Sequence, residues 1–510
     1  MYIMIALVKQ LSNKTLMAKI NEINWPTDVT SVAAAPGTAV GSDGSVATVP
    51  EAERRRAIWK NEFLRRLELD EPGFKKDDFA GIEMINIPEG LVHLRNGTFF
   101  GCNNLKFILP TSLEIIGDRA FAHCKWLTTI VFPESLESIP ESLKMIGDFA
   151  FKNCSNLTNI EFPESLESIG EWAFQSCSNL KNIDITQTNI TSISGFAFAH
   201  CSELTTIKFP ASLKMIGDGA FVDCRTLTNI VFPKSLESIG NGAFEFCRKL
   251  TNIVFPESLE SIGHQAFSNN SNLTNIDMTQ TNITSISDFA FHKCLNLTNI
   301  VFPESLKTIG NGAFSHCEGL TTIVFPESLE SIGSRAFQIC SNLKNIDMTQ
   351  TNITSILPLT FKDCSNLTNI VFPGSLRMIG EGAFNNCSNL TNIVFPKSLE
   401  SIGNQAFSNN SNLTNIDMTQ TNITSISPTT FENCTGLTTI VFPGSLRMIG
   451  CWAFCNCANL KKIDLHHTQI TSIQKYAFLD CNLQEVDLPN NQVDIKHGAF
   501  DAHVRVRYAG

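Results

Sequence analysis

The sequence of 510 residues has no apolar run approaching the ~20 residues that a membrane-spanning helix needs, so no membrane span is predicted. Its formal net charge of -11 disfavours nucleic acid and anionic membranes as partners. It lacks a glycine-rich phosphate loop, a nucleophile elbow and a His-Glu-x-x-His motif, and its histidines fall at varied positions. These absences predict no catalytic residues, no cofactor and no metal, and they favour a protein as the partner.

What the sequence does contain is an internal repeat that begins at Ile82. Eighteen units align, most of them at nearly equal steps of about 23 residues. In one of them the apolar residues between Leu320 and Phe325 are spaced like a short strand, which Pro326 ends because proline cannot donate the next ladder hydrogen bond. The segment from Ala336 to Cys340 fits one short helical turn. Each coil is therefore predicted to give one strand to a parallel sheet and one helical or irregular segment to the opposite face.

The return path of the same unit is predicted to help fill the interior. Leu329 and Ile332 are expected to turn inward, and Gly333 to permit a tight bend. A single coil cannot bury this apolar row alone, so neighbouring coils must cover it. Stability is then close to a sum of nearest-neighbour interfaces.

The repeated pattern is Ile/Leu-x-x-Ile-x-Phe-Pro-x-x-Leu-x-x-Ile-Gly-x-x-Ala-Phe-x-x-Cys, from Ile82 to about His503. It resembles the leucine-rich repeats of BspA-like surface proteins, the Treponema type. The resemblance implies an α/β fold, a right-handed solenoid shaped as a horseshoe or superhelix. A parallel β-sheet would line the concave face, with short helical or irregular turns on the convex face. The resemblance implies function only loosely, because BspA-like proteins include bacterial adhesins, protist surface antigens and intracellular proteins.

Five segments are predicted along the chain. They are an N-terminal segment with weak helix (1–25), a flexible linker (26–50), a helical N-terminal cap (51–81), the leucine-rich repeats (82–482), and a degenerate last repeat with a C-terminal cap (483–510). The cap helix is indicated by the apolar stripe of Trp59, Phe63 and Leu67. One insertion, Glu134 to Pro140 echoed by Glu141 to Gly147, is expected to bulge outward as a loop.

The sequence also contains a longer repeat. Leu273, Leu343 and Leu413 each begin a unit in which the Phe-Pro pair is replaced, and each of these units follows the previous one by three coils. Two stretches separated by two such intervals, Ile253 to Ser287 and Ile393 to Ser427, differ at only two positions. Such near-identity indicates recent duplication of whole blocks. Near-identical coils should offer near-identical binding sites, each weak by itself and gaining strength by multivalency.

The binding surface is predicted at the outward strand positions of the concave face. Its residues are Thr298, Asn299, Thr321, Thr322, Lys344 and Asn345, joined by Val301, Val324, Asp277, Asp347 and Asp417. The three aspartates cannot share one calcium ion, since neighbouring members are three coils, about 14 Å, apart, whereas calcium ligands lie within roughly 2.3–2.6 Å of the ion.

Cysteine recurs at a fixed position of the repeat among the seventeen in the chain. We interpret this column as core, because Asn270 and Asn410 replace the thiol in otherwise normal coils; a redox or metal role is the alternative. The densest cluster is Cys451, Cys455 and Cys457, followed by His466 and His467. It has no recognised zinc spacing.

Together these features predict a non-enzymatic protein-protein interaction scaffold in the cytoplasm. The thiol column favours that compartment, and the apolar start from Met1 to Val8 has no basic residue before it, which makes it a weak signal peptide. One alternative is a BspA-like cell-surface or secreted adhesin. A more distant one is a parallel β-helix enzyme acting on polysaccharides, which would need clustered acids or bases where this chain has mostly Thr, Asn and Val.

Overall fold

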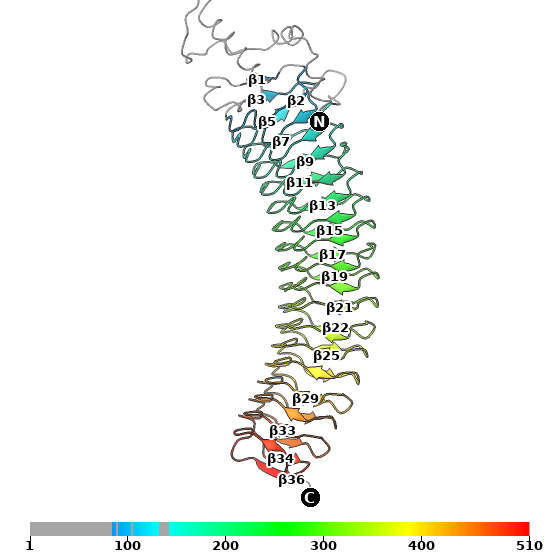
Figure 1. Cartoon of the computed structure of the whole chain (residues 1–510), viewed down its shortest axis with the longest axis vertical. Helices are drawn as coiled ribbons and strands as arrows, with labels where there is room; N and C mark the ends of the chain where they lie inside the picture. The colour runs from blue at the N-terminus through cyan, green and yellow to red at the C-terminus, as the bar shows by residue number, and fades with distance from the viewer. Residues whose placement is uncertain (1–83, 88–89, 104–105, 132–141, 509–510) are drawn as a thin grey trace, which may run out of the picture. The chain divides into compact units, whose positions relative to one another are not determined.

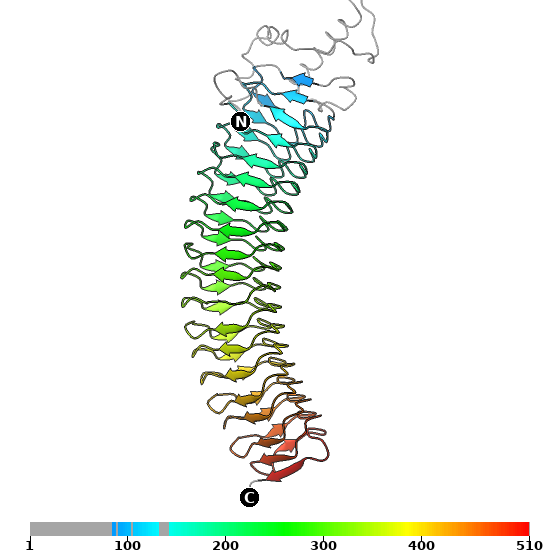
Figure 2. The ribbon, with the colours of Figure 1, turned by 180° about the vertical axis from the view of Figure 1, so that it is seen from behind.

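A computed structural model describes residues 84–508 of the chain, apart from 88–89, 104–105 and 132–141. The chain divides into two compact units, unit 1 (Met1–Leu227) and unit 2 (Thr228–Gly510). The described residues of each unit form a stack of coils (Figures 1 and 2). The segments predicted for 1–25, 26–50 and 51–81, and the inserted residues 134–140, lie outside the described residues.

Each coil of unit 1 contributes two short strands. The first strands are β1 (Met84–Asn86), β3 (Lys106–Ile108), β5 (Thr129–Val131), β7 (Asn159–Ile160), β9 (Asn182–Asp184) and β11 (Thr206–Lys208). The second strands are β2 (His93–Leu94), β4 (Ile115–Ile116), β6 (Met145–Ile146), β8 (Ser168–Ile169), β10 (Ser192–Ile193) and β12 (Met215–Ile216).

Unit 2 repeats this arrangement. Its first strands are β13 (Asn229–Val231), β15 (Asn252–Val254), β17 (Asn275–Asp277), β19 (Asn299–Val301), β22 (Asn345–Asp347), β24 (Asn369–Val371), β26 (Asn392–Val394), β28 (Asn415–Asp417), β30 (Thr439–Val441), β32 (Lys462–Asp464), β34 (Glu485–Leu488) and β36 (Arg505–Tyr508). Its second strands are β14 (Ser238–Ile239), β16 (Ser261–Ile262), β18 (Ser285–Ile286), β20 (Thr308–Ile309), β21 (Ser331–Ile332), β23 (Ser355–Ile356), β25 (Met378–Ile379), β27 (Ser401–Ile402), β29 (Ser425–Ile426), β31 (Met448–Ile449), β33 (Ser472–Ile473) and β35 (Asp494–Ile495).

All strand pairs recorded within each unit are parallel, and equal repeat positions face each other. In unit 2, Asn275 of β17 lies opposite Asn299 of β19. Thr322 extends the sheet of β22 by a parallel bridge to Asn345. The predicted parallel sheet is confirmed. The prediction of one strand per coil is incomplete, because the return path pairs as well: Ile309 of β20 lies opposite Ile332 of β21.

The core of each unit is a set of columns, each built from one repeat position. Leu320 and Phe314 are fully buried, and Ile332 is buried as predicted. The Phe314 and Phe337 rings of successive coils stack with their centroids 5.4 Å apart and their planes 8° apart. A residue in a column therefore packs mainly against its own counterparts above and below.

The predicted helical turns on the convex face are wrong. The described residues contain no helix, and so none with the length and apolarity needed to cross a membrane. In the segment from Phe289 to Cys294, every second amide donates to the next coil, as Phe291 N does to the carbonyl oxygen of Ala313 at 2.9 Å. The amides between them close tight turns, as His292 N does to the carbonyl oxygen of Phe289 at 3.0 Å.

This alternation requires a left-handed backbone at two positions of the turn segment, with φ of 56° at Phe289 and 58° at Lys293. An α-helix would direct all of these amides along its own axis and leave the neighbouring coil without partners. The Ala-Phe-x-x-Cys spacing suits either structure, since both bring residues three apart to the same side. The observed turns form instead of a helix because they supply hydrogen bonds to the adjacent coil.

Gly333 is required for a different reason from the one predicted. Its φ is not positive, but a Cβ added there would lie 2.5 Å from Asn311 N and from the Gly310 carbonyl carbon. Those atoms belong to the backbone of the preceding coil. The glycine therefore allows two coils to approach closely.

Candidate binding surface

The predicted surface residues lie on the exposed faces of two sheets built from the first strands of unit 2, one containing β17 and β19 and the other containing β22 and β28. Thr298, Asn299, Thr321, Thr322, Lys344, Asn345, Asp277, Asp347 and Asp417 are all exposed. They occupy strands β17, β19, β22 and β28, or the residues beside them, and the coil that begins at Leu320. Their predicted exposure is confirmed, and their role in binding stays a prediction.

The threonines of this surface also hold the sheet together. Thr298 Oγ1 donates to the carbonyl oxygen of Thr274 in the preceding coil at 3.1 Å. Thr368 Oγ1 makes the same contact with Lys344 at 3.1 Å. Part of the threonine row is thus explained by side-chain bonding between coils, without any partner.

The aspartates close local turns at the ends of their strands. Asp277 Oδ1 accepts hydrogen bonds from the backbone N of Thr279 at 2.9 Å and from its hydroxyl at 2.8 Å. Corresponding bonds from the backbone and hydroxyl of Thr349 lower the pKa of Asp347. The Asp347 carboxylate is therefore charged, and these hydrogen bonds hold the Asp277 and Asp347 carboxylates in fixed positions on the surface.

A row of valines shares the aspartates' strand position. Val254 lies opposite Asp277, which lies opposite Val301. Val394, Asp417 and Val441 repeat this order. Val231, Val254, Val324 and Val394 are 72–80% exposed. The Val-Asp row, defined as Val231, Val254, Asp277, Val301, Val324, Asp347, Val371, Val394, Asp417 and Val441, was only partly foreseen from the sequence, because its length depends on the strand register.

The cysteine column is a core feature, as predicted. Cys317 Sγ donates to the carbonyl oxygen of Phe291 in the preceding coil at 3.2 Å, and Cys340 Sγ to that of Phe314 at 3.3 Å. All seventeen thiols are free. Burial raises the pKa of the Cys201 thiol to about 12, which keeps it protonated and unreactive.

The cluster of Cys451, Cys455 and Cys457 with His466 and His467 does not form one site, since His466 groups with two aspartates and with none of these cysteines. Cys457 is buried and donates to the carbonyl oxygen of Phe431 at 3.2 Å. Among the described residues, the one group able to offer three metal ligands is Asp464, His466 and Asp487, whose ligand atoms lie within 4.8 Å of one another. Lys462 Nζ already lies 2.7 Å from Asp487 Oδ2 and supplies the compensating positive charge.

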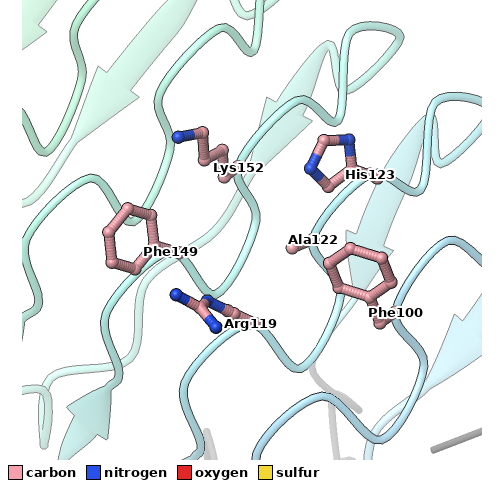
Figure 3. Close-up of a pocket in the computed structure, with 6 residues that line it drawn as sticks. All are labelled: Phe100, Arg119, Ala122, His123, Phe149 and Lys152. Atoms are coloured by element: carbon pink, nitrogen blue, oxygen red, sulfur yellow. The ribbon is translucent and has the colours of Figure 1, made fainter.

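A second surface feature was missed by sequence reasoning. The turn segments of unit 1 line a pocket of about 270 Å³ (Figure 3). Its walls are Phe100, Arg119, Ala122, His123, Phe149 and Lys152. The signal in the sequence was weak, because these residues occupy variable positions of three coils and meet only when the coils are stacked.

The parallel stacked coils define the chain as a leucine-rich-repeat solenoid. The model of the BspA type leucine rich repeat region matches residues 74–143, 138–247, 214–294, 284–414 and 377–506. The chain belongs to this family, which separates it from the parallel β-helix enzymes. The comparison with curated proteins found no match.

Solved bacterial structures are similar to the chain. A leucine-rich repeat protein from Bacteroides ovatus is 29% identical over 75% of this chain and 92% of its own, with a TM-score of 0.60. A leucine rich cell surface protein from Faecalibacterium prausnitzii is 21% identical, covering 71% and 88% of the two chains, with a TM-score of 0.33. The T. pallidum leucine rich repeat protein is 25% identical, covering 41% and 78%, with a TM-score of 0.26.

Proposed function

We propose that the chain is a non-enzymatic scaffold that binds a protein through the exposed faces of the two sheets built from the first strands of unit 2. The observation that supports this most strongly is the Val-Asp row. Single exposed apolar residues are ordinary on protein surfaces, but valines that recur at one strand position give a partner several apolar contacts along the stack. The fixed carboxylates of Asp277, Asp347 and Asp417 add negative charge at regular intervals.

The partner that fits this row is a protein with aliphatic side chains next to basic groups. Valine methyl groups gain by being removed from water, at roughly 25 cal/mol per Å² of apolar surface. The aspartates would steer basic groups toward the row and disfavour acidic partners. Successive blocks offer the same chemistry, so an extended or multivalent partner gains most.

Three conservative changes test the surface. In the full chain, Val254→Thr, Val324→Thr and Val394→Thr together keep the branched shape and remove the apolar contact. A partner recovered with the parent chain should bind at least tenfold more weakly to this variant, measured by calorimetry. Leu295→Thr is the matched control, because Leu295 is also exposed, at 41%, but lies outside the Val-Asp row. Equal binding by all three chains would reject the proposed surface.

A deletion tests redundancy. Removing the block from Leu273 to Asn342 joins Asn272 to Leu343 and restores a normal repeat junction. Binding should weaken and persist, because equivalent sites remain. Complete loss of binding with an unchanged circular dichroism spectrum would show that the sites are not equivalent.

We propose a cytoplasmic location, supported by the buried thiols that serve as hydrogen-bond donors in the core. A cell-surface or secreted adhesin is the alternative. Detection of glycan on a sequon such as Asn272-Leu273-Thr274 in the native protein would favour the adhesin.

A further inference from the structure

The turn segments of unit 1 carry a row of aromatic rings at one left-handed position. The rings of Phe149 and Trp172 are stacked with centroids 6.2 Å apart, and those of Trp172 and Phe196 with centroids 4.1 Å apart. The preceding coil has Arg119 at this position, with φ of 56°. The stack therefore ends at Phe149, whose outer side meets a cation where a further ring would continue the row.

Two cations gather around this terminal ring. The Arg119 guanidinium carbon lies 5.2 Å from the Phe149 centroid. Lys152 Nζ lies 5.0 Å from the same centroid and 5.4 Å from that of Trp172, so it borders both rings of the stack. In the part of the chain that the structure describes, neither side chain forms an ion pair with a carboxylate. In a chain of net charge -11 this gives a local pair of cations that border aromatic rings.

The second wall of the pocket is also aromatic. The Phe100 ring, 47% exposed, packs against the His123 ring with centroids 5.1 Å apart. Figure 3 shows Phe149 and Phe100 on opposite sides of the pocket, with Arg119 and Lys152 on two different sides of the Phe149 ring. Burial, together with Lys152 and Lys125, lowers the pKa of His123, so the positive charge at neutral pH comes from Arg119 and Lys152.

We infer that this pocket binds a ring-sized ligand that carries an oxyanion, with the ring between Phe100 and Phe149 and the oxyanion at Arg119 and Lys152. Each cation can donate charge-assisted hydrogen bonds to a carboxylate, sulfate or phosphate. A neutral ring would leave these charges uncompensated, and a cation would be repelled. The volume of about 270 Å³ limits the bound group to about one ring.

Unit 2 contains an internal control for this inference. Arg335 and Lys362 occupy the same repeat positions as Arg119 and Lys152, again in successive coils, and φ at Arg335 is 58°. Leu359 replaces Phe149 there, and Ser315 replaces Phe100. Lys362 Nζ also lies 3.9 Å from Asp363 Oδ2. The second pair thus has the cations without the aromatic walls.

The test measures binding of three anionic probes to the full chain by calorimetry: phenyl phosphate, glucuronate and inorganic phosphate. Glucose and phenol are the neutral probes. Phenyl phosphate or glucuronate should bind, and whichever binds tighter distinguishes an aromatic from a sugar source of the ring. Inorganic phosphate should bind at least tenfold more weakly, because it cannot use the aromatic walls. Binding should weaken as salt rises.

Variants assign the binding to the pocket. Arg119→Gln and Lys152→Gln should each weaken binding of the tighter probe about tenfold or more, and Phe149→Leu should do so several-fold. Arg335→Gln and Lys362→Gln should leave it unchanged, with thermal melts confirming that all variants are folded. The inference is overturned if neither ring-bearing anion binds, if glucose or phenol binds as tightly as they do, if inorganic phosphate binds as tightly, or if the unit 2 variants lose binding equally.

Discussion

The side chain of Asn410 is fully buried with its amide oxygen unpaired. Its Nδ2 donates to the carbonyl oxygens of Phe384 at 3.0 Å and Phe407 at 2.7 Å, but Oδ1 has no partner. In the next coil, Cys434 fills the same column position and donates its thiol to Phe407 without introducing a further acceptor. The cysteine column is therefore the better solution to the same site.

Asn410→Cys should accordingly stabilise unit 2. Removing an orphaned buried acceptor gains ~1–3 kcal/mol, and losing one of the two Nδ2 bonds returns ~1 kcal/mol, so the net gain is about 1 kcal/mol. Denaturant unfolding in reducing buffer measures it. The reverse change, Cys434→Asn, should lower the free energy of unfolding by a similar amount. A destabilised Asn410→Cys protein would mean that the orphaned oxygen is not the dominant cost.

The role of a residue could be predicted from the sequence where the same kind of residue recurs at the same repeat position. The inward Leu329 and Ile332 and the cysteine column followed from periodicity alone. The pocket did not, because Phe100, Arg119 and Phe149 belong to three different coils and repeat in no pattern. The Val-Asp row lay between these cases: its composition was visible, and its length depended on register.

At the scale of the element, the contact between turn segments limits what each coil can carry. Gly333→Ala should cost about 1–3 kcal/mol, because the new methyl group would meet backbone atoms of the preceding coil that cannot move aside cheaply. Thermal and denaturant melts measure the loss. Gly374→Ala is the control: no atom lies within 4 Å of its added Cβ, so its effect should stay within about 0.5 kcal/mol. Equal effects at both positions would show that close approach is not what selects Gly333.

Element type was the least predictable level. The second strands are very short, as in β21 with its two residues, which leaves too little alternation to be recognised in a sequence. The turn segments looked helical because Ala336, Phe337 and Cys340 have helical spacing. Both errors have one physical source. A solenoid coil obtains its hydrogen bonds from neighbouring coils, whereas single-sequence reasoning weighs only bonds within the segment.

For the whole chain, the ends should matter more than the number of coils. Truncation after Asn482 removes only the last repeat and the tail, including the fully buried Val486 and Leu488. It also uncovers the Phe478 ring, which stacks on Phe500 with the centroids 5.3 Å apart. Deleting Leu273 to Asn342 removes a much longer segment but leaves every kind of coil interface covered. The shorter truncation should therefore lower Tm more and cause aggregation, detected by light scattering. A larger loss from the internal deletion would mean that the number of coil interfaces, rather than the cap, determines the stability.

Because of the duplicated blocks, the sequence does not specify uniquely which coil stacks on which during folding. A coil is recognised by its neighbour only through column residues, and the stretches Ile253 to Ser287 and Ile393 to Ser427 present almost the same ones. During refolding, either stretch can dock on the neighbour of the other and extrude the intervening coils as a loop. Each doubling of a loop costs only ~0.6 kcal/mol more, so length hardly penalises the mistake. Vectorial synthesis, in which coils emerge one at a time and stack on the last one formed, removes this ambiguity, and the protein is thus better suited to folding from the ribosome than from denaturant.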